Sequence, residues 1–68
     1  MTKTIKIEGM SCSHCQAAVE RALNAIDGVK AAVDLAAGTA TVSLSRAVPD
    51  EVLRQAVEEE EFTVLGIA

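Results

Sequence analysis

The sequence has almost no aromatic residues: among its 68 residues there is one phenylalanine, Phe62, and no tryptophan or tyrosine. Hydrophobic residues nevertheless make up 50% of the chain. The core must therefore be built from Val, Ile, Leu and Ala side chains. A chain of this length buries only about 60% of the surface that its unfolded form exposes. We therefore expect residues 1–68 to form a single domain of modest stability.

Long hydrophobic runs are also absent. No apolar stretch approaches the ~20 residues that a helix needs to cross a bilayer. Residues 1–7 alternate polar and apolar side chains and lack the continuous apolar segment of a secretory signal. The sequence therefore predicts a cytoplasmic protein without membrane insertion.

Basic residues are too few to form a strongly positive face. Residues 1–34 balance four basic with four acidic groups, residues 35–68 carry two basic and six acidic groups, and the formal net charge is −4. Nucleic acid binding requires a basic surface, so the composition argues against a nucleic acid partner. An acidic surface is suited to a partner that carries a basic patch.

The chain has only two cysteines and one histidine, and all three lie in the segment Gly-Met-Ser-Cys-Ser-His-Cys, residues 9–15. In a reducing compartment, two thiols favour a metal or redox role over a structural disulfide. Thiolates select soft cations such as Cu(I) and Zn(II). Zinc normally takes three or four protein ligands, whereas Cu(I) is satisfied by two nearly linear sulfur ligands. The number of ligands therefore favours Cu(I), with Cys12 and Cys15 as the ligands.

Two other residues of this segment can be interpreted in two ways. Met10 either fills the core beneath the loop or offers a thioether ligand, and the first use suits an unbranched, flexible side chain better. His14 either lies exposed and tunes the site electrostatically, or acts as a third ligand or a bridge to metal in a second molecule. We favour the exposed position for His14.

Hydrophobic periodicity predicts four strands and two helices. The strands are expected at residues 2–8, 29–35, 39–45 and 62–67, the last carrying Val64, Leu65 and Ile67. The first helix is expected from Ser13 to the Asp27-Gly28 pair, with a buried stripe of Cys15, Ala18, Val19, Ala22, Leu23 and Ile26. The second helix is expected from Pro49 to about Glu60, with a buried stripe of Val52, Leu53, Ala56 and Val57.

Local signals define the ends of these elements. Ser11 or Ser13 is expected to cap the first helix, and Gly28 to take a left-handed conformation at the end of that helix. Cys12 and Cys15 then lie at the positive end of the helix dipole, where free amides stabilise a thiolate. Between the second and third strands, Gly38 is suited to positive φ in a short hairpin.

The order β-α-β-β-α-β predicts an α+β, ferredoxin-like sandwich with two helices on one face of a four-stranded antiparallel sheet. In this fold the loop after the first strand lies beside the loop before the last strand, so Phe62 is expected near the cysteines. Phe62 is then either a partly buried core ring or an apolar cover over the metal. The acidic run Glu58–Glu61 is either a solvated surface or a docking patch.

Gly-Met-x-Cys-x-x-Cys between a strand and a helix resembles the heavy-metal-associated domain. This domain is found in small cytosolic copper chaperones and at the N-termini of metal-transporting P-type ATPases. The resemblance covers the whole chain, because residues 38–42, 56–58 and 62–64 also fit the family. Relatives often have Tyr or Lys in place of Phe62 and Gly in place of Glu61.

The resemblance implies a function in copper traffic. A copper chaperone of this kind would deliver Cu(I) to a copper-transporting P-type ATPase or to its metal-binding domain, by ligand exchange. A metal-bridged homodimer is an alternative use of the same site. Zinc and mercury are the alternative metals; zinc-selective relatives tend to carry an acidic residue where this chain has Ser11, and mercury carriers are usually exported.

The remaining alternative is an enzyme, a thiol-disulfide oxidoreductase, because cysteines at a helix N-terminus also suit disulfide exchange. Against it, no aromatic residue precedes Cys12, no proline lies between the cysteines, and the chain is too short for a thioredoxin-like domain. We therefore expect a metal carrier and not an enzyme.

Overall fold

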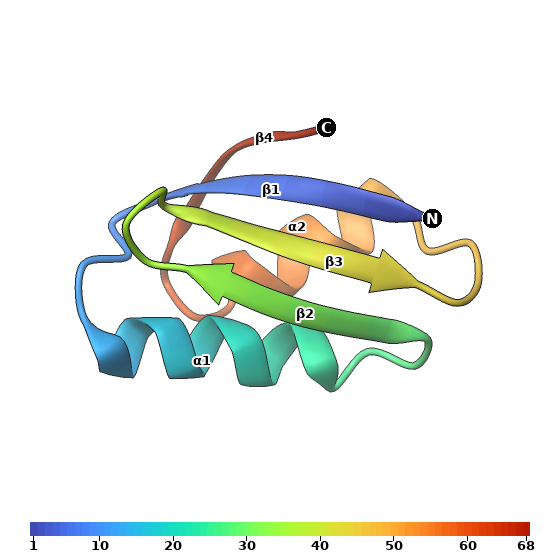
Figure 1. Ribbon diagram of the computed structural model, residues 1–68, viewed down its shortest axis with the longest axis horizontal. Helices are drawn as coiled ribbons and strands as arrows, with labels where there is room; N and C mark the ends of the chain where they lie inside the picture. Colours follow the sequence, from blue (N-terminus) through green and yellow to red (C-terminus); the bar gives the residue numbers. More distant parts are fainter.

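The computed structural model describes all 68 residues and shows two helices packed on one face of a four-stranded antiparallel sheet (Figure 1). The elements in chain order are β1 (Thr2–Glu8), α1 (Ser13–Asn24), β2 (Val29–Asp34), β3 (Thr39–Leu44), α2 (Asp50–Glu58) and β4 (Thr63–Ile67). The strand order across the sheet is β2-β3-β1-β4. The predicted ferredoxin-like architecture is therefore confirmed.

The core lies between the sheet and the two helices, and every buried residue in it is apolar. In β1, Ile5 and Ile7 are buried while Lys6 and Glu8 are exposed, as the period-two pattern predicts. The helices contribute two fully buried residues each. The fully buried helical residues are Val19 and Leu23 in α1 and Leu53 and Val57 in α2.

Strand β4 contains an irregularity that the alternation pattern did not predict. Ile7 pairs with Val64, but the preceding residue, Lys6, pairs with Gly66, so Leu65 is an extra residue in β4. The bulge turns Leu65 outward, where it is 56% exposed. Val64 and Ile67 can then both pack against the core, although they are three residues apart. The bulge explains why the apolar residues of this strand do not alternate.

Helix α2 differs from its prediction at both ends and on one face. Pro49 is the N-cap residue and not the first helical residue, with φ −61° and ψ 145° and no side-chain capping bond. The helix ends at Glu58, before the predicted Glu60, and residues 59–61 form the turn that leads into β4. Val52 is 40% exposed, so it does not belong to the buried stripe. The fully buried residues of the helix are Leu53 and Val57, which lie four residues apart on one face.

Helix α1 ends at Asn24, earlier than the sequence predicts. Gly28 does take a left-handed conformation, with φ 84°, but it lies in the turn after the helix and not at the helix end. Arg46 packs over it: a Cβ atom built on Gly28 would come within 2.8 Å of the Arg46 Cγ atom. Gly28 is therefore required both by its φ angle and by the close approach of this side chain.

Glu61 is the only residue other than glycine with positive φ, at 69°. This conformation costs a residue with a Cβ atom about 1–2 kcal/mol, partly offset by the entropy that glycine loses on folding. We predict that Glu61→Gly raises the free energy of unfolding by about 0.5–1 kcal/mol, measured by urea denaturation. Glu61→Gln, which removes only the charge, is the matched control. Equal stabilisation by both variants would attribute the effect to charge repulsion and contradict a backbone origin.

Candidate metal centre

The loop between β1 and α1 brings the two cysteines to the start of the helix. Cys12 is the N-cap residue of α1, with extended backbone angles, and its Sγ atom accepts a hydrogen bond from the Cys15 amide at 3.3 Å. The prediction that Ser11 or Ser13 caps the helix is therefore wrong. It rested on the preference of N-caps for hydroxyl and carboxylate oxygens, whereas here a thiol is the acceptor.

Both thiols are free, and their Sγ atoms lie 2.7 Å apart. Cys12 is exposed, while Cys15 is half-buried and packs against the edge of the core. Cys15 is thus held by the first turn of α1, and Cys12 lies on the more accessible loop. The two predicted ligands converge on one point that a ligand from outside can reach.

Local hydrogen bonds favour the thiolate form of Cys12. The hydrogen bond from the Cys15 thiol, followed by the Cys15 backbone amide, lowers the pKa of Cys12, and the His14 amide adds to this effect. A small loss of hydration at this exposed thiol acts in the opposite direction, but the net effect is a lowered pKa of Cys12. A lowered pKa increases the fraction of thiolate near neutral pH, and thiolate is the form that binds a metal. The Cys15 thiol and the backbone amides at the start of α1 therefore together favour the thiolate form of Cys12.

His14 is exposed in the first turn of α1. Nowhere in the structure do three or more His, Cys, Asp or Glu side chains form a group that could hold a metal ion. The donors that converge are thus the two sulfur atoms, and His14 contributes its backbone amide to the environment of Cys12. The structure agrees with the interpretation of His14 as an exposed residue.

We predict that His14→Ala retains Cu(I) binding, because both sulfur atoms and the backbone amide remain. The Cu(I) affinity, measured by competition with a chromogenic chelator, should change by less than about tenfold, the lower limit for the loss of an outer-shell partner. The association of protein molecules in the presence of the metal should change more than the Cu(I) affinity does. Ser13→Ala, at the neighbouring exposed position, is the control. A loss of Cu(I) affinity above about 100-fold would identify His14 as a ligand.

Two apolar residues support the loop that carries the cysteines. Met10 is only 6% exposed and belongs to the core, which confirms its predicted packing role. Phe62 is half-buried against the core, and its Cδ1 atom lies 3.7 Å from the position of a Cβ atom built on Gly9. The two loops are therefore adjacent, as the fold prediction requires, and Phe62 packs against the start of the metal loop.

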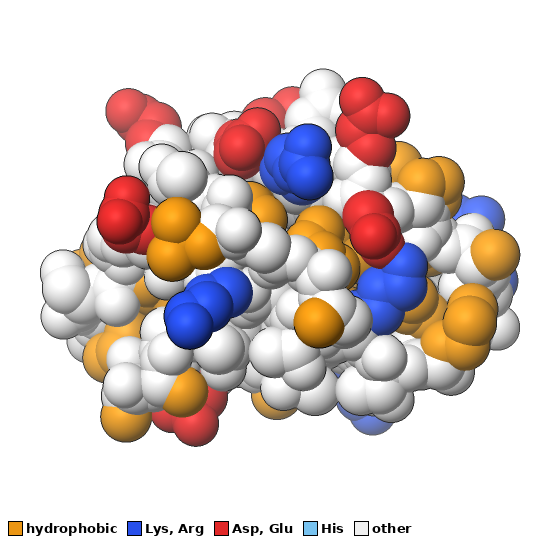
Figure 2. All heavy atoms as spheres, turned by 90° about the horizontal axis from the view of Figure 1, so that it is seen from above, with side chains coloured by type: hydrophobic (Ala, Val, Ile, Leu, Met, Phe, Trp, Pro, Cys, Tyr) orange, Lys and Arg blue, Asp and Glu red, His pale blue; other side chains and the backbone are white.

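The acidic run Glu58–Glu61 is exposed along its whole length. The ion pairs of the structure lie elsewhere, between Lys3 and Asp50 and between Arg46 and Asp27. Figure 2 shows positive and negative side chains interspersed on one face of the molecule. The exposure of the run is compatible with both predictions made for it, a solvated surface and a docking patch.

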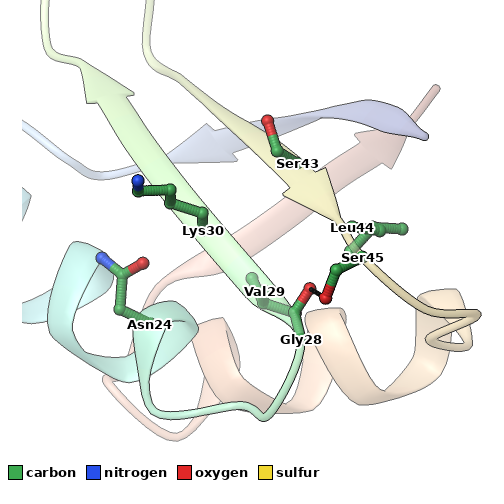
Figure 3. A pocket seen from close by; sticks show the side chains of 7 residues that line it. All are labelled: Asn24, Gly28, Val29, Lys30, Ser43, Leu44 and Ser45. Carbon is green, nitrogen blue, oxygen red and sulfur yellow. Dashed lines mark hydrogen bonds between the residues drawn. The ribbon is translucent and has the colours of Figure 1, made fainter.

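A shallow hollow of about 570 Å³ lies at the far end of α1 from the cysteines (Figure 3). Its lining consists of Asn24, Gly28, Val29, Lys30, Ser43, Leu44 and Ser45. The Ser45 hydroxyl donates a hydrogen bond to the Gly28 carbonyl at 3.3 Å and so joins the two loops there. The lining has no thiol, imidazole or carboxylate group, so the hollow lacks the groups that bind soft metals.

None of the helices is both long enough and apolar enough to cross a membrane.

Comparison with known proteins agrees with this geometry. The chain is 43% identical over 68 residues to the copper chaperone CopZ of Staphylococcus saprophyticus, covering 93% of this chain and 96% of that protein. Among solved structures, it superimposes on a CopZ metallochaperone with a TM-score of 0.90 at 39% identity, covering 96% of this chain and 100% of that one. A copper-binding domain from the P-type ATPase HMA7 gives a TM-score of 0.85 at 32% identity, covering 98% and 97%. Residues 4–63 match the heavy-metal-associated domain, and the chain belongs to this family.

Proposed function

We propose that the protein is a copper chaperone that binds Cu(I) through Cys12 and Cys15 and delivers it to a partner by ligand exchange. The observation that carries the proposal is the pair of free thiols that converge at the N-terminus of α1, with no third metal-binding side chain grouped with them. The similarity to proteins named as CopZ copper chaperones supports copper as the cargo.

The chemistry of the donors supports the oxidation state. Two thiolates form a soft ligand set, and soft ligands favour Cu(I) among the metals available to a cell. A zinc site would need further ligands, and the structure brings no third side chain of the metal-binding types to the pair. We therefore propose Cu(I) as the bound species, and Zn(II) and Hg(II) as the metals against which this must be tested.

Exposure of the site supports transfer. Because Cys12 is exposed on the loop, a thiolate of a partner can approach the metal while both sulfurs of the chaperone are still bound. A three-coordinate intermediate then forms, and the chaperone sulfurs leave one at a time. The metal keeps its charge throughout, and each new Cu–S bond replaces an old one. Tight binding is thus compatible with fast exchange.

The proposed partner is a copper-transporting P-type ATPase or its metal-binding domain. Support comes from the HMA7 copper-binding domain, which has the same fold as this chain over nearly its whole length. A domain of this kind would present a similar loop to the chaperone. A second copy of the chain could supply the same thiolates, which would give a metal-bridged homodimer.

We further propose that the protein acts in the cytoplasm and not as an enzyme. A reducing compartment keeps Cys12 and Cys15 as free thiols, which the metal requires. Oxidoreductase activity is tested by the reduction of insulin disulfides at catalytic protein concentrations. Turnover in that assay would overturn the assignment as a simple carrier.

The decisive test is an anaerobic titration of reduced protein with Cu(I) against a chromogenic chelator, with a matching Zn(II) competition. We expect tight capture of about one Cu(I) per chain, or one shared within a dimer, and weak retention of zinc. Transfer is then followed by mixing the loaded protein with a P-type ATPase metal-binding domain and measuring copper in each after separation. Preferential zinc binding would refute copper as the cargo, and absence of transfer would refute the delivery step alone.

A further inference from the structure

The outer edge of β2 is closed by side chains of α1. β2 is an edge strand, and α1 runs along it (Figure 1). The amide and carbonyl groups on the outer side of an edge strand are normally free to pair with another strand. In this protein, the outward groups of Ala31 and Val33 are already hydrogen-bonded to the helix.

Asn24 satisfies both outward groups of Ala31. Its Oδ1 atom accepts a hydrogen bond from the Ala31 amide at 2.8 Å, and its Nδ2 atom donates to the Ala31 carbonyl at 3.4 Å. Figure 3 shows Asn24 at the end of α1 with its amide directed toward β2. This side chain therefore pairs with Ala31 as a neighbouring strand would.

Glu20 and Gln16 do the same for Val33. The Glu20 Oε2 atom accepts from the Val33 amide at 3.4 Å, and the Gln16 Nε2 atom donates to the Val33 carbonyl at 3.3 Å. Gln16, Glu20 and Asn24 are four residues apart, so they lie in one row along the helix. At the end of the strand, the Val29 amide donates to the Ile26 carbonyl at 3.1 Å. The side chains of this row thus bond Ala31 and Val33, and the Ile26 carbonyl bonds Val29, so the outward groups are engaged at every second residue of β2.

Without this row, β2 is well suited to pair with itself. Two copies of β2 in antiparallel register about Ala32 would place Ala31 of one copy opposite Val33 of the other, and these residues carry the outward groups. In the same register Lys30 of one copy lies opposite Asp34 of the second copy, which places opposite charges side by side. A two-fold axis makes both pairs occur twice.

We propose that Gln16, Glu20 and Asn24 form an edge guard that prevents β2 from pairing with β2 of a second copy. The opposite edge is protected differently, because the bulge at Leu65 interrupts the regular ladder of β4. This device is independent of the metal. It keeps strand pairing from competing with encounters through the cysteine loop.

The test uses the double variant Glu20→Ala, Asn24→Ala, which removes three of the four hydrogen bonds and leaves Gln16, next to Cys15, unchanged. The matched control is Gln55→Ala, Glu58→Ala, which removes one amide and one carboxylate from exposed positions of α2. In metal-free, reduced protein, we expect the parent and the control to stay monomeric by sedimentation velocity up to millimolar concentration. The double variant should dimerise, with intermolecular contacts between β2 strands detected by NMR.

Hydrogen exchange gives a second readout. In the parent, the Ala31 and Val33 amides should be protected although they lie on an outer edge. In the monomeric variant at low concentration they should exchange about tenfold faster, the size expected for the loss of one hydrogen bond. Fast exchange of these amides in the parent overturns the proposal, as does a double variant that stays monomeric at every concentration. If the double variant is unfolded, Asn24→Ala alone carries the same test at Ala31.

Discussion

The Cys12→Ser variant is expected to lose nearly all Cu(I) affinity while its fold is retained. The two cysteine sulfur atoms are the proposed ligands, so the loss of one removes on the order of half of the binding free energy. For a site of ~10 kcal/mol, the lower range for structural metal sites in proteins, half is ~5 kcal/mol, or more than about 1,000-fold in affinity. Chelator competition under anaerobic conditions measures this loss, and Cys15→Ser should show a loss of the same order.

The retained fold follows from the second role of Cys12. Its sulfur atom caps α1 by accepting a hydrogen bond from the Cys15 amide, and a serine hydroxyl is among the best N-cap acceptors. Cys12→Ala removes both the ligand and the cap. Its free energy of unfolding, measured by urea denaturation, should therefore be about 1 kcal/mol lower than that of Cys12→Ser. Equal stability of the two variants would show that the capping bond contributes little. Full Cu(I) affinity in Cys12→Ser would refute the two-thiolate site.

The Leu23→Ala variant should be among the most destabilising changes away from the metal loop. Leu23 is fully buried between α1 and the sheet, and truncating such a leucine costs about 2–5 kcal/mol. A 68-residue domain of this kind has a small margin of stability. We therefore expect a substantial unfolded fraction at 37 °C, measured by circular dichroism and urea denaturation.

Leu65→Ala is the matched control for this prediction. The same side chain is truncated, but Leu65 is 56% exposed in the bulge of β4. Its loss should change the free energy of unfolding by less than about 0.5 kcal/mol. A cost at Leu65 comparable with that at Leu23 would contradict the outward position of the Leu65 side chain in the bulge.

These two leucines mark the limit of prediction from periodicity. Leu23 lies in a helix whose apolar residues recur at three- and four-residue intervals, so its burial follows from the sequence. Leu65 lies between two inward-facing residues of a strand, and only the register with β1 shows that an extra residue is present there. A one-residue shift in a strand reverses the face of each side chain that follows. Pattern analysis therefore cannot locate a bulge without the partner strand.

The same distinction applies to the candidate site. The amino-acid sequence by itself determined the element order, the convergence of Cys12 and Cys15 at a helix N-terminus, and the soft character of the donors, because these depend on spacing and residue type alone. The tertiary structure decided that Cys12 caps the helix, that Glu61 adopts positive φ before β4, and that α1 side chains close the edge of β2. Each of these depends on contacts or turns that form only when separate elements pack together, and no local pattern specifies such contacts.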